Sequence, residues 1–66
     1  MTHSIQTIQT RVTRDDNESA ARSRQLANRG EELTSYARHG YTLAHTAAIE
    51  SAESVTFVDT LTRPVD

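Results

Sequence analysis

The sequence predicts an α+β fold in the order β-α-β-β, with one helix packed on a small antiparallel sheet. A run of helix-forming residues ends at Gly40, and directly after it the apolar residues alternate with a period of two. The same alternation resumes after a short polar segment and continues to Pro64. With 66 residues, the chain predicts a single small domain spanning residues 1–66.

The first predicted element is a strand over residues 4–13. Its sequence, SIQTIQTRVT, places Ile8, Thr10 and Val12 on one side, while Ile5 is out of phase. The Gln and Thr content suits an edge strand or an interface.

The second predicted element is a helix over residues 17–39. Asp15, Asp16 or Asn17 can cap its start. Gly30 lies in its interior, where glycine costs about 1 kcal/mol relative to alanine, so the segment could also form two helices; we expect one. The residues expected to face the sheet are spaced three and four apart: Ser19, Ser23, Leu26, Gly30, Leu33 and Ala37, with Tyr36 beside them.

The last two elements are predicted as a hairpin of strands 41–50 and 54–63. Pro64 should end the pairing because it has no N–H to donate. A two-residue loop would lack the Gly or Asn that tight turns favour. We therefore expect a three-residue loop over residues 51–53, which sets His45 opposite Asp59 and Leu43 opposite Leu61.

This register predicts two different faces of the hairpin. One carries most of the apolar side chains and the pair His45 and Asp59. The other has no charge and only small side chains, which suits packing against a second copy of the chain. This expected interface comprises Thr42, Ala44, Thr46, Ala48, Thr56, Val58, Thr60 and Thr62.

The composition indicates a thin core. Only 35% of the residues are hydrophobic and there is no cysteine, so neither a large core nor a disulfide framework stabilises the domain. Self-association is the remaining way to stabilise the domain, so we expect a homo-oligomer. The expected core residues are Ile5, Ile8, Val12, Leu26, Leu33, Tyr36, Ala37, Tyr41, Leu43, Ile49, Val55, Phe57 and Leu61.

Charge and sequence motifs exclude several classes of function. The net charge of −2 argues against nucleic acid and anionic membranes as partners. The N-terminal residues form no apolar run long enough for a signal peptide or membrane span, so a cytoplasmic location is expected. No spacing of His, Asp or Glu indicates a metal site, and no cofactor motif is present.

The helix ending in YARHGYTL, the following hairpin and the terminal LTRP resemble a family of short bacterial and phage proteins that is catalogued as a domain of unknown function. The resemblance covers roughly residues 4–64. Its specific part is a helix that stops at a Gly followed by an aromatic residue, here Gly40-Tyr41, and a last strand ending on Arg63-Pro64. The polar helix start, residues 17–29, departs from the family pattern. The resemblance implies the fold and no activity.

Two groups of residues could carry chemistry. His45 and Asp59 could form a proton-handling or ligand-binding pair. Alternatively, they could form a structural pair in which each provides the other's polar partner at the edge of the core. In a second group, Tyr41 and Arg63 are expected as cross-strand neighbours, with the guanidinium over the ring, and Arg38 and His39 are close in sequence. These four residues could receive a small anion or form a solvated rim.

We therefore expect a non-enzymatic interaction module that self-associates and binds a protein partner. One alternative is a protein that binds or sequesters a small anionic, nucleotide-like molecule. Another is a small enzyme that uses His45 and Asp59.

Overall fold

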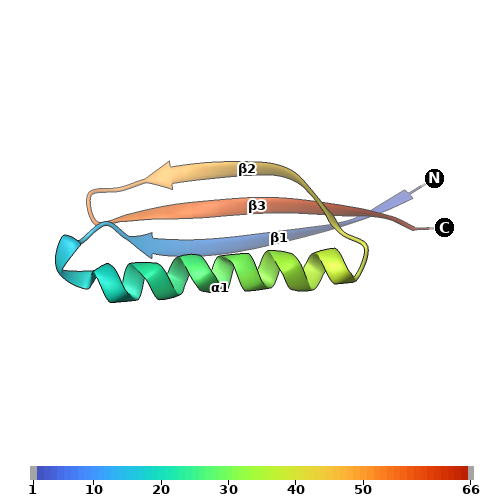
Figure 1. Cartoon of the computed structure of the whole chain (residues 1–66). Helices are drawn as coiled ribbons and strands as arrows, with labels where there is room; N and C mark the ends of the chain where they lie inside the picture. Colours follow the sequence, from blue (N-terminus) through green and yellow to red (C-terminus); the bar gives the residue numbers. More distant parts are fainter. Residues whose placement is uncertain (1, 66) are drawn as a thin grey trace.

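The computed structural model describes residues 2–65 and shows the predicted β-α-β-β order, with one helix on a three-stranded antiparallel sheet. The strand order is β1-β3-β2, so the last strand of the chain is central. Figure 1 shows α1 running along the β1 side, with β2 at the far side of the sheet. The elements are β1 (Thr2–Thr13), the short 3₁₀ helix η1 (Asp16–Glu18), α1 (Ser19–Arg38), β2 (Thr42–Glu50) and β3 (Ser54–Val65).

The helical segment begins with a side-chain cap of the predicted kind. The side chain of Asp15 accepts a hydrogen bond from the backbone N–H of Asn17 at 2.9 Å, which satisfies one of the free donors at the start of η1. The segment then continues through Gly30 without a break. The prediction of a continuous helix is confirmed, whereas the predicted cap lies on η1, and α1 itself begins at Ser19 without a side-chain cap.

The face of α1 that meets the sheet differs from the predicted stripe. Five of the six members of that stripe are exposed: Ser19, Ser23, Leu26, Gly30 and Ala37. The helical side chains with lower exposure include Arg22, Gln25, Arg29, Leu33 and Tyr36, also spaced three and four apart. The prediction was wrong because long polar side chains, rather than small ones, make the contacts with the strands.

The hairpin register is one residue away from the prediction over most of β2. His45 lies opposite Thr60, and Glu50 lies opposite Val55. The backbone N–H of Ser51 donates to the carbonyl of Ser54 at 2.8 Å, which leaves a two-residue loop. The hydroxyl of Ser51 accepts a hydrogen bond from the N–H of Ser54 at 3.2 Å, so side-chain bonds support a tight turn that has no glycine.

An irregularity between Leu43 and His45 restores the predicted register at the start of β2. Leu43 lies opposite Leu61 as predicted, because Ala44 is an extra residue on β2, a β-bulge. The three-residue loop was therefore wrong, and the alternation in the sequence concealed the bulge.

The strand β3 also extends beyond the predicted stop. Pro64 is paired with His3 of β1, whereas the pairing with β2 ends at Thr62. Pro64 thus lies where β3 has a single neighbouring strand, which is the position in a sheet that tolerates a missing N–H.

Paired residues of an antiparallel sheet point to the same face, so the register separates two faces. The helix face carries Asp59, which Arg29 of α1 contacts. We call the opposite surface the open face, because it turns away from α1. It comprises His3, Ile5, Thr7, Gln9 and Arg11 of β1, Thr56, Val58, Thr60 and Thr62 of β3, and Thr42, His45, Ala47 and Ile49 of β2.

The core is smaller than predicted. Among the described residues the buried apolar side chains are Ile8, Val12 and Leu61, all on the helix face. Four members of the expected core are instead exposed: Ile5, Leu26, Leu43 and Ile49. Ala37 is exposed as well. The single helix packs mainly along the β1 side and contacts β2 much less, so most of β2 stays exposed (Figure 1).

The two glycines should respond oppositely to alanine. Gly40 has φ of +86°, and a Cβ there would lie 3.3 Å from Cδ of Arg63, so Gly40→Ala should cost about 1–2 kcal/mol. Gly30 lies in the helix interior with nothing within 4 Å of an added Cβ, so Gly30→Ala should stabilise the domain by up to about 1 kcal/mol. Urea unfolding followed by circular dichroism measures both, and equal stability of the two variants would contradict the argument.

Candidate functional site

The most tightly built polar cluster joins the helix to both β2 and β3. Asp59, on the central strand, is fully buried. Arg29 of α1 donates to both of its carboxylate oxygens, from Nε at 3.0 Å and from Nη2 at 2.8 Å. The hydroxyl of Thr46 donates to the same carboxylate at 2.7 Å. The guanidinium of Arg29 also lies 4.6 Å from the ring centre of Phe57.

These contacts set the charge of the carboxylate. The hydrogen bonds from Arg29 lower the pKa of Asp59; burial opposes this shift, and the hydrogen bond from Thr46 supports it. The same carboxylate raises the pKa of Arg29. Both groups are thus charged at neutral pH, and each carboxylate oxygen already accepts a hydrogen bond. The cluster is arranged to hold α1 on the sheet.

The predicted pair of His45 and Asp59 is not formed. His45 is exposed on the open face, whereas Asp59 lies on the helix face. The residue directly opposite Asp59 is Thr46. The one-residue change in register explains the error, since it moves each residue from 45 to 50 to the other face of β2.

A second cluster lies where α1 ends and β2 begins. A guanidinium nitrogen of Arg63 donates to the backbone carbonyl of His39 at 3.0 Å, and the guanidinium carbon lies 4.8 Å from the ring centre of Tyr41. Tyr41 in turn bonds Ser4 of β1 through their hydroxyls at 2.9 Å, which lowers the pKa of Tyr41. Tyr36 meets Tyr41 edge to face at 5.4 Å.

Of the four residues expected to receive an anion, the structure brings together three: Arg63 contacts the ring of Tyr41 and the backbone carbonyl of His39. Arg63 is engaged with a carbonyl at the end of α1, so it closes the helix terminus. The ring nitrogen Nδ1 of His39 lies 2.8 Å from the carbonyl oxygen of Ser35. Arg38 is exposed on α1. Anion binding by this group stays a prediction.

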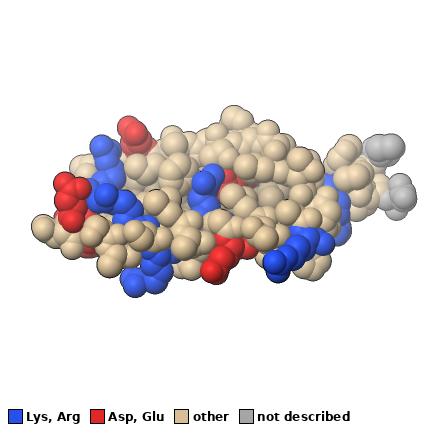
Figure 2. Space-filling model, in the orientation of Figure 1, with Lys and Arg blue, Asp and Glu red and all other residues tan. Residues whose placement is uncertain are grey.

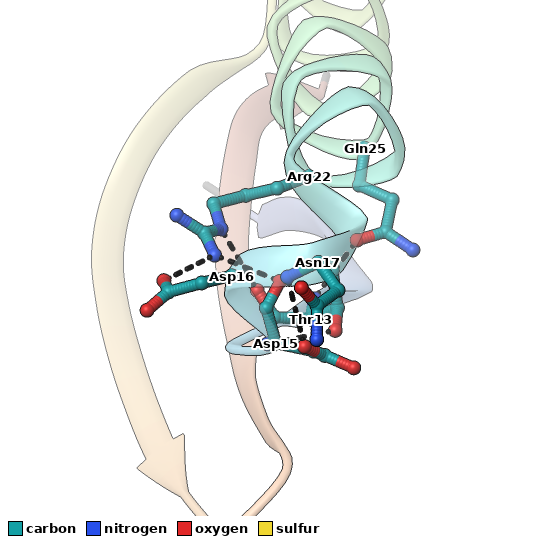
Figure 3. A network of polar contacts seen from close by, with 6 residues as sticks. All are labelled: Thr13, Asp15, Asp16, Asn17, Arg22 and Gln25. Carbon is teal, nitrogen blue, oxygen red and sulfur yellow. Dashed lines mark hydrogen bonds and ion pairs between the residues drawn. The ribbon is translucent and has the colours of Figure 1, made fainter.

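A third polar network fixes the connection from β1 to the helix (Figure 3). Arg22 donates to the backbone carbonyls of Thr13 and Asp15, at 3.2 and 3.0 Å. Gln25 accepts a hydrogen bond from the backbone N–H of Thr13 at 2.9 Å. An open hollow of about 710 Å³ lies beside this network. Its lining mixes both signs of charge and comprises Arg11, Thr13, Arg14, Asp15, Glu18, Gln25, Ala52, Glu53 and Ser54.

The strand β2 is the least covered part of the sheet. All of its residues are exposed except Ala47, which is half-buried. Its one charged residue is Glu50, at its end. Figure 2 shows mostly uncharged surface along the margin where β2 lies, with charged side chains gathered along α1 and near the hairpin turn.

The expected interface residues do not all share one face. Five of them lie on the open face: Thr42, Thr56, Val58, Thr60 and Thr62. Thr46 and Ala48 lie on the helix face because of the register change, and Ala44 is at the bulge. The role of these residues in association stays a prediction.

Sequence reasoning missed the most buried cluster. The signal for Arg29 is weak, because a helical Arg normally indicates solvent-exposed surface. An alternative helix face with the same spacing of three and four contains Gln25, Arg29, Leu33 and Tyr36. The periodicity therefore allows this face as well as the predicted one and does not choose between them.

Between Thr2 and Val65, no three His, Asp or Glu side chains are grouped as metal ligands. Within the same range, no helix is long and apolar enough to cross a membrane. No protein-family model, no curated protein and no solved structure matches this chain.

Proposed function

We propose that this protein is a non-enzymatic interaction module that self-associates and, once assembled, binds a protein partner. The observation that carries the proposal is the amount of surface that a single copy leaves in contact with water.

The exposed area is large for the mass. A folded monomer of 7.3 kDa should expose about 4,200 Å², whereas this chain exposes 4758 Å². The excess of about 600 Å² matches the lower end of the area that each partner buries in a stable complex, about 600–1,000 Å². A second copy would remove an excess of this size from water.

The exposed surface is also partly apolar. Ile5 is 63% exposed and Ile49 is 60% exposed, with Leu26 and Leu43 near 45%. Three apolar side chains are buried among the described residues, fewer than the four large ones that are exposed. Association would bury some of these side chains at about 25 cal/mol for each Å² of apolar area.

The proposal of a binding rather than a catalytic role rests on the use of the polar groups. The buried carboxylate of Asp59 is fully engaged by Arg29 and Thr46. Arg63 is engaged with a backbone carbonyl. Flat strand surfaces such as β2 and the open face suit contact with another protein better than enclosure of a small substrate.

The first test is the mass in solution. Light scattering at tens of micromolar protein is expected to give about twice the 7.3 kDa chain mass, or a higher multiple. Dilution should lower both the mass and the thermal midpoint, because folding and association are then linked. A monomer whose thermal midpoint does not change with concentration would contradict self-association.

A further inference from the structure

We propose that two copies of this chain pair edge to edge through β2, antiparallel, so that two three-stranded sheets become one six-stranded sheet. This inference rests on the proposed self-association and names the surface that makes it. The pairing spans the regular part of β2, residues 45–50.

The outer edge of β2 is unprotected between the bulge at Ala44 and Glu50. Because the strand order is β1-β3-β2, one edge of β2 faces away from β3. In the described chain, the backbone of Thr42–Glu50 makes no hydrogen bond to a side chain, turn or loop outside the sheet. The strand also lacks the Lys, Arg or Pro residues that block edge pairing.

The outer edge of β1, the other edge strand, is partly covered by side chains. Gln25 of α1 bonds the backbone N–H of Thr13, and Arg22 bonds its carbonyl. β1 also carries the exposed Arg11. Helix side chains and Arg11 thus protect the β1 edge, whereas along β2 the bulge at Ala44 and the charge of Glu50 lie toward the two ends and leave residues 45–49 open.

The exposed apolar side chains favour an added strand over a stacked sheet. Ile49 lies on the open face and Leu43 lies on the helix face of the same strand. They are 60% and 44% exposed. A copy stacked on the open face would cover Ile49 and leave Leu43 in water. A strand placed beside β2 flanks both faces, so it reduces the exposure of both residues.

Charge and symmetry select the antiparallel arrangement. A parallel pair would set Glu50 beside Glu50 of the second copy, and opposed like charges destabilise a sheet. An antiparallel pair places these glutamates at opposite ends. Its two-fold axis is perpendicular to the sheet, so both helices lie on one side. Because the bulge at Ala44 interrupts the regular strand, the axis falls near Ala47 or Ala48.

Single cysteines test this contact directly, because the chain has none of its own. Residues that face themselves across an antiparallel axis have Cα atoms about 4.5–5.5 Å apart, within the range for a disulfide. Under mild oxidation, Ala47→Cys or Ala48→Cys should give mostly covalent dimer. Thr7→Cys on the open face of β1 and Ser23→Cys on α1, both exposed, should remain largely monomeric on non-reducing gels.

A charge placed on the edge provides a second readout without oxidation. Ala48 is exposed, so Ala48→Lys should fold, yet it introduces the blocking charge that β2 lacks. We expect the dimer Kd to rise at least about tenfold, with Thr7→Lys unchanged. Dimers that cross-link through Thr7→Cys and tolerate Ala48→Lys would overturn the edge contact while leaving self-association intact. A monomer by light scattering would overturn both.

Discussion

Replacing Arg29 by leucine is expected to destabilise the domain by about 3–5 kcal/mol at neutral pH, because it leaves a fully buried carboxylate without its positive partner. The leucine keeps apolar bulk over Phe57, which Arg29 covers, so the loss reports mainly on the charge. The hydrogen bond from Thr46 remains, but a hydroxyl does not neutralise the carboxylate.

The same substitution should invert the dependence of stability on pH. In the wild-type protein the pKa of Asp59 is below its ordinary value because Arg29 donates to it. This contribution is present above the unfolded pKa of about 3.9 and is lost as the pH falls through the lower, folded pKa. In Arg29→Leu, burial should raise the pKa of Asp59 above 3.9 instead, so acidification from neutral pH should stabilise the variant.

Urea unfolding by circular dichroism between neutral and acidic pH measures both effects. The double variant Arg29→Leu with Asp59→Leu is the matched control, because removing both charges restores a neutral contact and should recover most of the stability. An Arg29→Leu variant as stable as the wild type, with the same pH dependence, would show that the ion pair does not hold the helix.

The second large effect is expected at Leu61, which is 2% exposed on the central strand. Leu61→Ala should cost about 2–5 kcal/mol, because it removes buried methyl groups and leaves a cavity. With three buried apolar side chains among the described residues, few neighbours can move to fill the space. The measurement is again the free energy of unfolding in urea.

Leu43 is the matched control for this prediction. It is the same residue type, lies directly opposite Leu61 on β2, and is 44% exposed. Leu43→Ala should therefore cost clearly less than Leu61→Ala, since about half of the side chain already contacts water. Similar losses for the two variants would mean that β2 is covered in solution, which would itself support association through that strand.

Local patterns predicted the elements but not their phase. The cap at Asp15, the stop at Gly40 and the alternation on both sides of the hairpin each depend on a few neighbouring residues, and each is observed. The face of α1 and the pairing of β2 depend on contacts between elements. There, the Ser51–Ser54 turn and the bulge at Ala44 decided the register.

The candidate sites illustrate the same difference. The contact of Tyr41 with Arg63 was predicted, because it lies where the bulge has restored the expected register. The pair of His45 and Asp59 was not formed, because it lies beyond the bulge. Asp59 was named as a candidate only through its expected pairing with His45, and its actual partners Arg29 and Thr46 became evident only from the packed structure.

The amino-acid sequence by itself determined the β-α-β-β order, the helix ends and the scarcity of apolar residues, because these follow from short-range propensity and composition. The tertiary structure alone decided that β3 is central, that Arg29 and Asp59 join the helix to the sheet, and that β2 stays uncovered. These outcomes depend on which distant residues meet. A shift of one residue in pairing exchanges the two faces of a strand while leaving the strand pattern in the sequence unchanged.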